Sequence, residues 1–61
     1  MESTDFAKII ADLREAGYSD ILLAKLSNCS RQYIGMIRRG ETKKVGHPIG
    51  SKLTKLHEAL Q

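Results

Sequence analysis

Apolar residues near the start of the chain recur every three or four positions, which is the spacing of one face of an α-helix. Four of them fall at positions i, i+3, i+4 and i+7: Phe6, Ile9, Ile10 and Leu13. The spacing predicts a helix over residues 5–16 that buries this face. Thr4, with Ser3 as a competitor, is the expected N-cap, because a hydroxyl there accepts a hydrogen bond from the first helical turn. Gly17 is expected to end the helix.

The last part of the chain shows the helical spacing again. Four apolar residues fall at i, i+4, i+7 and i+11 of one face: Ile49, Leu53, Leu56 and Leu60. Pro48 suits the first turn of such a helix, because its φ is preset and it has no N–H to leave unpaired. Gly50 weakens the start, so the helix begins either near Pro48 or at Ser51. Residues 41–46 are expected to form a loop before it.

Two shorter helices are predicted in the middle of the chain, over residues 20–26 and 31–39. Ser19 and Ser30 each stand directly before one of them, where a side-chain oxygen can accept from free backbone N–H groups. Gly40 follows the second helix, at the position where a left-handed residue commonly stops a helix. Only a three-residue turn is therefore expected between the two helices.

The turn over residues 27–29 and the apolar positions around it fit two helices that pack against each other. Asn28 tolerates a positive φ and can reverse the chain. Four side chains are expected to face inward: Ala24, Cys29, Ile34 and Ile37. Leu23 also belongs inside, together with one of Ile21 and Leu22, which packs against the first or the last helix. No strand is predicted, so residues 1–61 are expected to form one compact all-α domain of four helices.

The second of the middle helices has a distinctive outer face. Its residues carry hydrogen-bonding or cationic groups, or little side chain at all: Ser30, Arg31, Gln32, Gly35, Met36, Arg38 and Arg39. None of them is acidic, whereas a helix that merely faces water usually mixes the two signs of charge. This face is therefore the candidate binding surface.

Residues 23–40 fit the pattern L-A-x3-N-x-S-x3-I-x2-I-x2-G. This pattern resembles the helix-turn-helix of the phage Cro and repressor family, which usually has glycine where Asn28 stands. The lysine-bearing run 40–44 also resembles the loop that follows the recognition helix in that family. The resemblance implies a lambda-repressor-like DNA-binding fold. The slot of Ser27 is usually apolar in the family, and Leu26 lies one place earlier, which leaves two registers of the first motif helix open.

The resemblance also implies which residues read DNA bases. Five stand where base-contacting residues stand in the family: Ser30, Arg31, Gln32, Gly35 and Met36. Arg31 could donate twice to guanine O6 and N7, and Gln32 could pair with adenine N6 and N7. Met36 either packs on a thymine methyl or is a partly covered surface methionine. Gly35 costs about 1 kcal/mol against alanine in mid-helix, so either close packing or a close approach to DNA is expected to require it.

Phosphate contacts are expected to position the protein on the duplex. Six residues are the candidates: Tyr18, Ser19, Arg38, Arg39, Lys43 and Lys44. The helix start at Ser19 can offer backbone N–H groups to a phosphate. Tyr18 has the alternative of covering the core edge with its ring. Arg38 or Arg39 has the alternative of pairing with Glu41 or with an acid of the first helix.

The charge is divided unevenly along the chain. Residues 1–20 hold five acidic and two basic residues, a net charge of −3, whereas residues 21–61 hold eight basic and two acidic residues, a net charge of +6. The basic half contains the motif, which suits a polyanion bound by one face. Taken alone, the charge is equally compatible with an unevenly charged solvated surface.

Other function classes find little support. His47 and His57 have no metal ligands or nucleophiles clustered around them, and no phosphate-binding glycine loop is present. We therefore expect no enzyme activity, no cofactor, no metal and no small-molecule ligand. The single cysteine permits no intrachain disulfide. No apolar run reaches the roughly 18 residues that span a bilayer, and the acidic start is unlike a leader, so a cytoplasmic location in a bacterium or phage-infected cell is expected.

The sequence thus predicts a sequence-specific, double-stranded DNA-binding transcriptional regulator that resembles a Cro-like phage or prophage repressor. We expect it to read an operator as a weak or DNA-assisted homodimer, with the last helix as the contact, where Lys52, Lys55 and His57 surround the apolar stripe. The alternative is a protein-interaction module on the same fold, antirepressor- or antitoxin-like. The acid-free face of residues 30–39 favours DNA, because a protein-binding version would more often expose aromatic or leucine side chains there.

Overall fold

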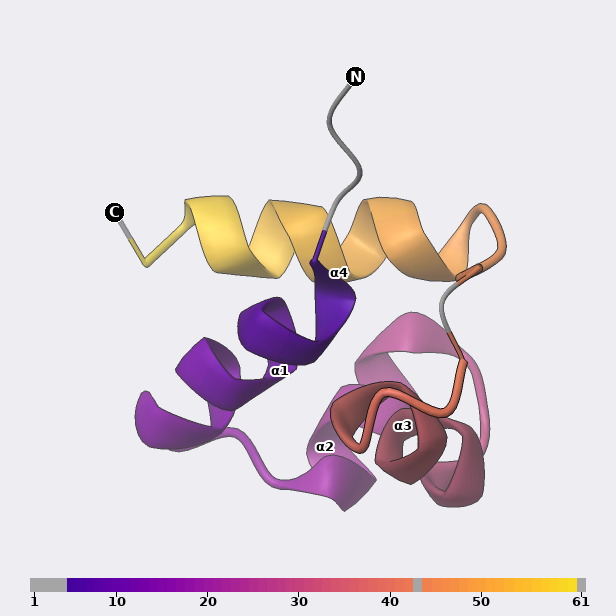
Figure 1. Ribbon diagram of the computed structural model, residues 1–61. Helices are drawn as coiled ribbons and strands as arrows, with labels where there is room; N and C mark the ends of the chain where they lie inside the picture. Colours follow the sequence, from indigo (N-terminus) through magenta and orange to yellow (C-terminus); the bar gives the residue numbers. More distant parts are fainter. Residues whose placement is uncertain (1–4, 43, 61) are drawn as a thin grey trace.

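Four α-helices make up most of residues 5–42 and 44–60, the part of the chain that the computed structural model describes (Figure 1). Their bounds are α1 Phe6–Glu15, α2 Asp20–Ser27, α3 Arg31–Arg38 and α4 Ile49–Glu58. No strand occurs within these residues. The expectation of an all-helical, four-helix fold is confirmed. Lys43, Thr4 and Ser3, which entered the sequence-based expectations, lie outside the described residues.

Side-chain caps start the first three helices. Ser19 Oγ accepts from Leu22 N at 3.1 Å, and Ser30 Oγ accepts from Tyr33 N at 3.0 Å, so both predicted serine caps are confirmed. The start of α1 differs from the prediction, because Asp5 is its N-cap and accepts from the backbone N–H of Lys8 at 3.2 Å. A carboxylate there also favours the positive end of the helix dipole.

The turns reverse the chain at residues with positive φ. Asn28 follows α2 with φ 60° and ψ 48°, as its tolerance of the left-handed region predicts. Immediately after it, the backbone N–H of Cys29 donates to Ala24 O at 2.9 Å. Gly40, just beyond α3, has a φ of 79°, which a residue without Cβ adopts freely. The turn at Asn28 brings α3 back against α2, and the one at Gly40 ends α3.

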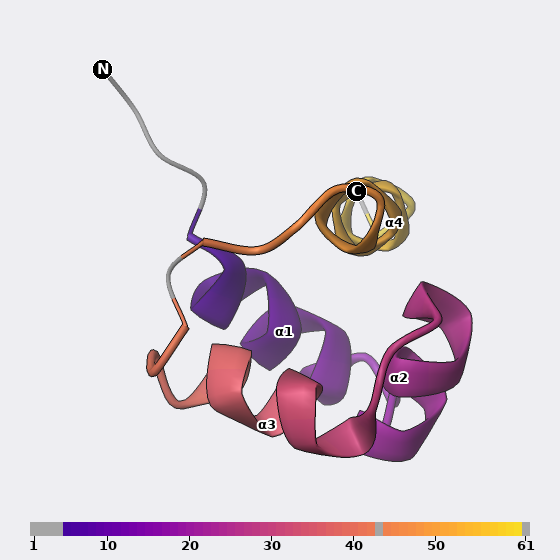
Figure 2. The ribbon, with the colours of Figure 1, turned by 90° about the vertical axis from the view of Figure 1, so that its right-hand side faces the viewer.

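The packing places α3 and α4 on opposite sides of the molecule. α1 and α2 each contact both of them, and Figures 1 and 2 show α4 on one side of this pair and α3 on the other. The core comprises eight buried apolar residues drawn from all four helices: Ile9, Ile10, Leu13, Leu23, Ala24, Ile34, Ile37 and Leu53. α3 is therefore fixed by its inner face, and its outer face is left free. No helix of the described residues is both long and apolar enough to cross a bilayer.

Three apolar residues that the spacing could place inside lie outside. Leu60, expected on the buried face of the last helix, is 42% exposed because it follows the end of α4. One of Ile21 and Leu22 was expected to pack inside, but the two side chains are 51% and 41% exposed. α2 is short and turns only its Leu23, Ala24 and Ser27 side into the core.

Glycine at position 50 is explained by contact with α1. A Cβ on Gly50 would lie 3.0 Å from Phe6 Cζ, a distance that would force the phenyl ring to shift. α4 begins at Ile49 with Pro48 at its N-cap position, so the alternative start at Ser51 is wrong. The helix tolerates the glycine because the ring of Phe6 fills the space that a side chain would take.

Ser27 settles the register of α2. Its side chain is fully buried and its Oγ has no hydrogen-bond partner among the described residues, whereas Leu26 is 41% exposed. Position 27, which is usually apolar in the family that the motif resembles, thus faces inward in this protein and carries a hydroxyl. A buried hydroxyl without a partner opposes folding, because it loses its bonds to water.

Ser27→Ala is expected to raise the free energy of unfolding by about 1 kcal/mol, because it removes the unpaired hydroxyl and improves helix propensity. The matched control is Ser19→Ala, which removes the N-cap hydrogen bond of α2 and should lower the free energy of unfolding by about 1 kcal/mol. Urea denaturation of the two variants measures both changes. A loss of stability in Ser27→Ala would mean that the hydroxyl bonds a backbone carbonyl of the preceding turn.

A polar contact also ties α4 to α1. His57 Nε2 lies 2.8 Å from Asp12 Oδ2, and Lys8 Nζ lies 3.6 Å from Asp12 Oδ1. The hydrogen bond to His57, helped by the charge of Lys8, holds the pKa of Asp12 below its ordinary value of 3.8. His57 is half-buried in this contact, so it does not project from α4 as a group free to meet another molecule.

Candidate nucleic-acid interface

The two faces of α3 differ sharply. Ile34 and Ile37 are buried against the rest of the domain, at 0% and 1% exposure. Five positions share the opposite side of the helical wheel: Arg31, Gln32, Gly35, Met36 and Arg39. The predicted separation of an inner and an outer face is thus present, and the outer one carries no acid.

The first turn of α3 is open to solvent. Ser30, Arg31 and Gln32 are all exposed. Ser30 uses its Oγ as the helix cap, which leaves that oxygen less free for a base, while the side chains of Arg31 and Gln32 make no hydrogen bond within the described residues. Met36, one turn further, is half-buried. Of the five predicted base-contacting residues, Ser30, Arg31 and Gln32 therefore lie at the exposed start of the helix, and the other two lie one turn further along it.

Gly35 lies on the outer side of α3 as expected, but it is buried rather than exposed. The three atoms nearest to the place of a Cβ all belong to the guanidinium of Arg39, the closest at 3.1 Å. The cover is thus the flexible end of a surface side chain and no part of the core. Close packing within the domain therefore does not explain this glycine. If Arg39 moves away, the bare backbone at Gly35 is open to close approach by another molecule.

Arg39 is held over Gly35 by a partner on the following loop. Its Nε donates to Glu41 Oε2 at 2.9 Å. This hydrogen bond, reinforced by the charges, lowers the pKa of Glu41 and raises that of Arg39. Both side chains are about half exposed, at 49% and 54%, so the pair is screened by water and contributes little to stability. Of the two pairings foreseen for the arginines, the one with Glu41 is present.

Arg38 has a different environment from Arg39. Its Nη2 lies 3.4 Å from Asp20 Oδ2, and Arg14 Nε lies 3.7 Å from Asp20 Oδ1. Asp20, at the start of α2, thus joins α1, α2 and α3 by charge. Arg38 Nε is buried without a hydrogen-bond partner in the described part of the chain. The pairing acid belongs to α2 rather than to α1, and Arg38 lies beside the outer face of α3 instead of on it.

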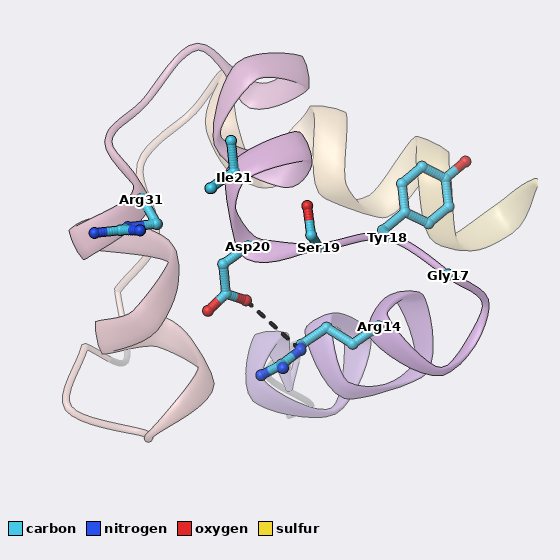
Figure 3. A pocket seen from close by; sticks show the side chains of 7 residues that line it. All are labelled: Arg14, Gly17, Tyr18, Ser19, Asp20, Ile21 and Arg31. Atoms are coloured by element: carbon cyan, nitrogen blue, oxygen red, sulfur yellow. Dashed lines mark ion pairs between the residues drawn. The ribbon is translucent and has the colours of Figure 1, made fainter.

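A hollow of about 390 Å³ lies where α1, α2 and α3 meet. Figure 3 shows Asp20 between Arg14 and Arg31, with Ser19 beside it at the start of α2 and the ring of Tyr18 turned away. Tyr18 is half-buried against the core, which favours its packing role. The hollow thus holds one carboxylate, that of Asp20, beside the guanidinium groups of Arg14 and Arg31.

Arg14 is a candidate phosphate contact that the sequence-based reasoning missed. It stands in the last turn of α1, outside the residues that resemble the family, and only the return of the chain at Gly17 brings it to the hollow. The positive φ of 113° at Gly17 marks that turn. The sequence carried a signal only for the turn, in Gly17 two residues after the end of α1, and none for the place of Arg14.

The remaining predicted residues lie on the loop or outside the described chain. Lys44 is exposed beyond α3, and Lys43 is not among the described residues. Within those residues, no group of three or more histidine, cysteine or acidic side chains could hold a metal ion. Cys29 is half-buried, and burial raises the pKa of its thiol, which suits a packing role.

No protein-family model matches the chain, and no curated protein or solved structure is similar enough to count as a match.

Proposed function

We propose that this protein is a sequence-specific, double-stranded DNA-binding transcriptional regulator, most similar in design to a Cro-like repressor. The observation that carries the proposal is the exposed, acid-free first turn of α3, with Arg31 and Gln32 side by side. In this reading α2 and α3 form a helix-turn-helix, and α3 is the recognition helix that enters the major groove. Both side chains carry donors that match purine edges there.

Phosphate contacts would flank the recognition helix on two sides. On one side stands the hollow at the start of α2, with its backbone N–H groups and Arg14. On the other side stand Arg39 and Lys44, at the end of α3 and on the following loop. Contacts on both sides of a helix would fix its orientation in the groove, as phosphate contacts generally do.

The regulator would act on an operator as two copies. Each recognition helix would enter one half-site, and the two half-sites would lie about 34 Å apart on one face of the duplex. Assembly would occur mainly on DNA, since adjacent half-sites bring two copies together. Repression would follow from blocking polymerase and needs no chemistry from the protein.

The salt dependence of binding to duplex DNA tests this proposal. We expect the logarithm of affinity to fall linearly with the logarithm of salt concentration, with a slope of about −3 to −4 for four contacted phosphates per copy. Lys44→Gln should reduce the slope by about 1. The matched control is Lys52→Gln on α4, which should leave the slope unchanged. Affinity without a salt slope, or equal effects of the two variants, would contradict the proposed interface and favour a protein-interaction module.

Glu41→Gln is expected to strengthen DNA binding roughly three- to tenfold, because it removes an acid from the interface and frees Arg39. Glu58→Gln on α4 makes the same change of charge away from α3 and should alter the affinity less than about twofold. Fluorescence anisotropy with a labelled duplex measures both. A similar gain in the two variants would mean that net charge, rather than the release of Arg39, causes the effect.

A further inference from the structure

A second hollow, of about 340 Å³, lies between α2 and α4 and is lined by Leu26, Lys52, Lys55 and Leu56. Leu26 is 41% exposed, and so is Leu22, which stands one turn earlier on the same face of α2. The volume is at the small end of the range of about 300–1,000 Å³ typical of ligand pockets. Such a groove suits a few apolar side chains better than a large ligand.

The rim of this groove is cationic and has no acid in its lining. Lys52 and Lys55 are exposed, and neither has an ionic partner among the described residues, whereas Lys8 and Arg39 on other surfaces are paired. Lysine stems can cover apolar surface while their ammonium groups remain free to meet a carboxylate. The groove therefore presents apolar contact in its floor and unpaired positive charge at its edge.

We propose that the α2–α4 groove binds an acidic amphipathic helix of another protein. Two apolar side chains one turn apart on that helix would enter the groove beside Leu26 and Leu56. Aspartate or glutamate residues flanking them would pair with Lys52 and Lys55. This is the helix-in-groove mode of recognition, in which an apolar stripe sets the position and charge sets the choice of partner.

Charge argues against a second copy of the chain as the occupant. A two-fold contact through the groove would bring Lys52 and Lys55 of both copies together, and like charges facing each other oppose association. His57, the third residue expected at such a contact, is engaged with Asp12 of its own chain. α4 is therefore assigned to an acidic partner instead of to the dimer contact expected from the sequence.

The groove and the outer face of α3 lie on different sides of the molecule. Figures 1 and 2 show α4 on the side of the α1–α2 pair away from α3. An acidic helix bound between α2 and α4 would therefore leave α3 open, and a partner protein and a nucleic acid could be bound at once. This separation lets one experiment distinguish the groove from the proposed DNA interface.

The test titrates the isotope-labelled full chain with a synthetic helical peptide of about 16 residues, long enough to form a helix on binding. The peptide carries leucines at i and i+4 and glutamates on either side of them. We expect amide NMR signals of Leu26, Lys52, Lys55 and Leu56 to shift. In the double variant Lys52→Glu, Lys55→Glu the affinity should fall roughly tenfold or more, because both rim charges are reversed.

Two controls and one further variant of the groove accompany the titration. A peptide with lysine in place of each glutamate should not bind. Lys44→Glu, on the loop after α3, should leave the affinity for the acidic peptide within about twofold. Leu26→Ser, at an exposed position, should abolish the shifts while leaving the fold intact, as circular dichroism would verify.

Three results would overturn the proposal. The acidic peptide could shift the amide signals of α3 instead of those of the groove, which would mean that it binds the cationic face of α3 in place of DNA. The acidic and basic peptides could bind equally, which would show an unselective apolar surface. Without peptide, the groove signals could move with protein concentration while the sedimenting mass doubles, which would make a second copy the occupant.

Discussion

Arg31→Ala is expected to weaken binding to a selected operator by about 1–3 kcal/mol, which is roughly 5- to 150-fold. Arg31 is exposed in the first turn of α3 and makes no hydrogen bond within the described residues, so its guanidinium is free to donate twice to a guanine edge. The loss should be largest for operators that carry guanine at one position, and discrimination at that position should relax. Anisotropy titrations with the operator and with single-base variants measure both effects.

The control for Arg31→Ala is a random-sequence duplex titrated with the same variant. Its affinity should fall much less than that of the operator, because non-specific binding depends on phosphate charge rather than on base edges. An equal loss on both duplexes would make Arg31 a phosphate contact. Gln32→Ala should behave like Arg31→Ala, but at an adenine.

Leu23→Ala is expected to lower the free energy of unfolding by about 2–5 kcal/mol, as large-to-small changes in a close-packed core do. Leu23 is fully buried, at 0% exposure. A chain of 61 residues has a total stability of only about 3–9 kcal/mol at typical values per residue. The variant should therefore lose a large fraction of this stability and unfold at a markedly lower temperature.

Leu22→Ala provides the matched control, because it makes the same chemical change in the same helix at a side chain that is 41% exposed. It should cost less than about 1 kcal/mol. Thermal unfolding followed by circular dichroism compares the two variants. Similar losses would contradict the register of α2 in which Leu23 faces the core and Leu22 faces solvent.

Local chemistry explains why the starts of α2 and α3 were predictable. Ser19 and Ser30 cap within three residues of their own position, and Asn28 adopts its positive φ for reasons internal to one residue. Such features depend on the chain nearby and hardly on the rest of the fold. The inner face of α3, with Ile34 and Ile37, was predictable for a similar reason, because helical spacing fixes which residues share a side.

Contacts between distant segments explain what the sequence could not reveal. The cover on Gly35 depends on where Arg39 is drawn by Glu41. Arg38 pairs with an acid of α2 because α2 and α3 pack side by side, whereas spacing along the chain gave no reason to prefer Asp20 over an acid of α1. Spacing also cannot say where a helix ends, which is why Leu60 was expected to be buried.

The candidate site shows the same division. Arg31, Gln32 and Met36 could be named as candidate base contacts because the sequence around them resembles a known helix-turn-helix motif. Arg14 could not be named from the sequence, because only the packing of α1 brings it to the hollow at the start of α2. Residues that join a site from outside the motif require the three-dimensional arrangement.

The most direct measurement is a selection of bound sequences from a random duplex pool, with the purified protein at moderate salt. Recognition by α3 in two copies predicts enrichment of a palindromic motif whose half-sites are centred about 10 base pairs apart. The enriched bases should include a guanine and an adenine whose contribution is lost in Arg31→Ala and Gln32→Ala. Failure to enrich any motif, with only weak and salt-sensitive binding, would contradict sequence-specific DNA recognition by this protein.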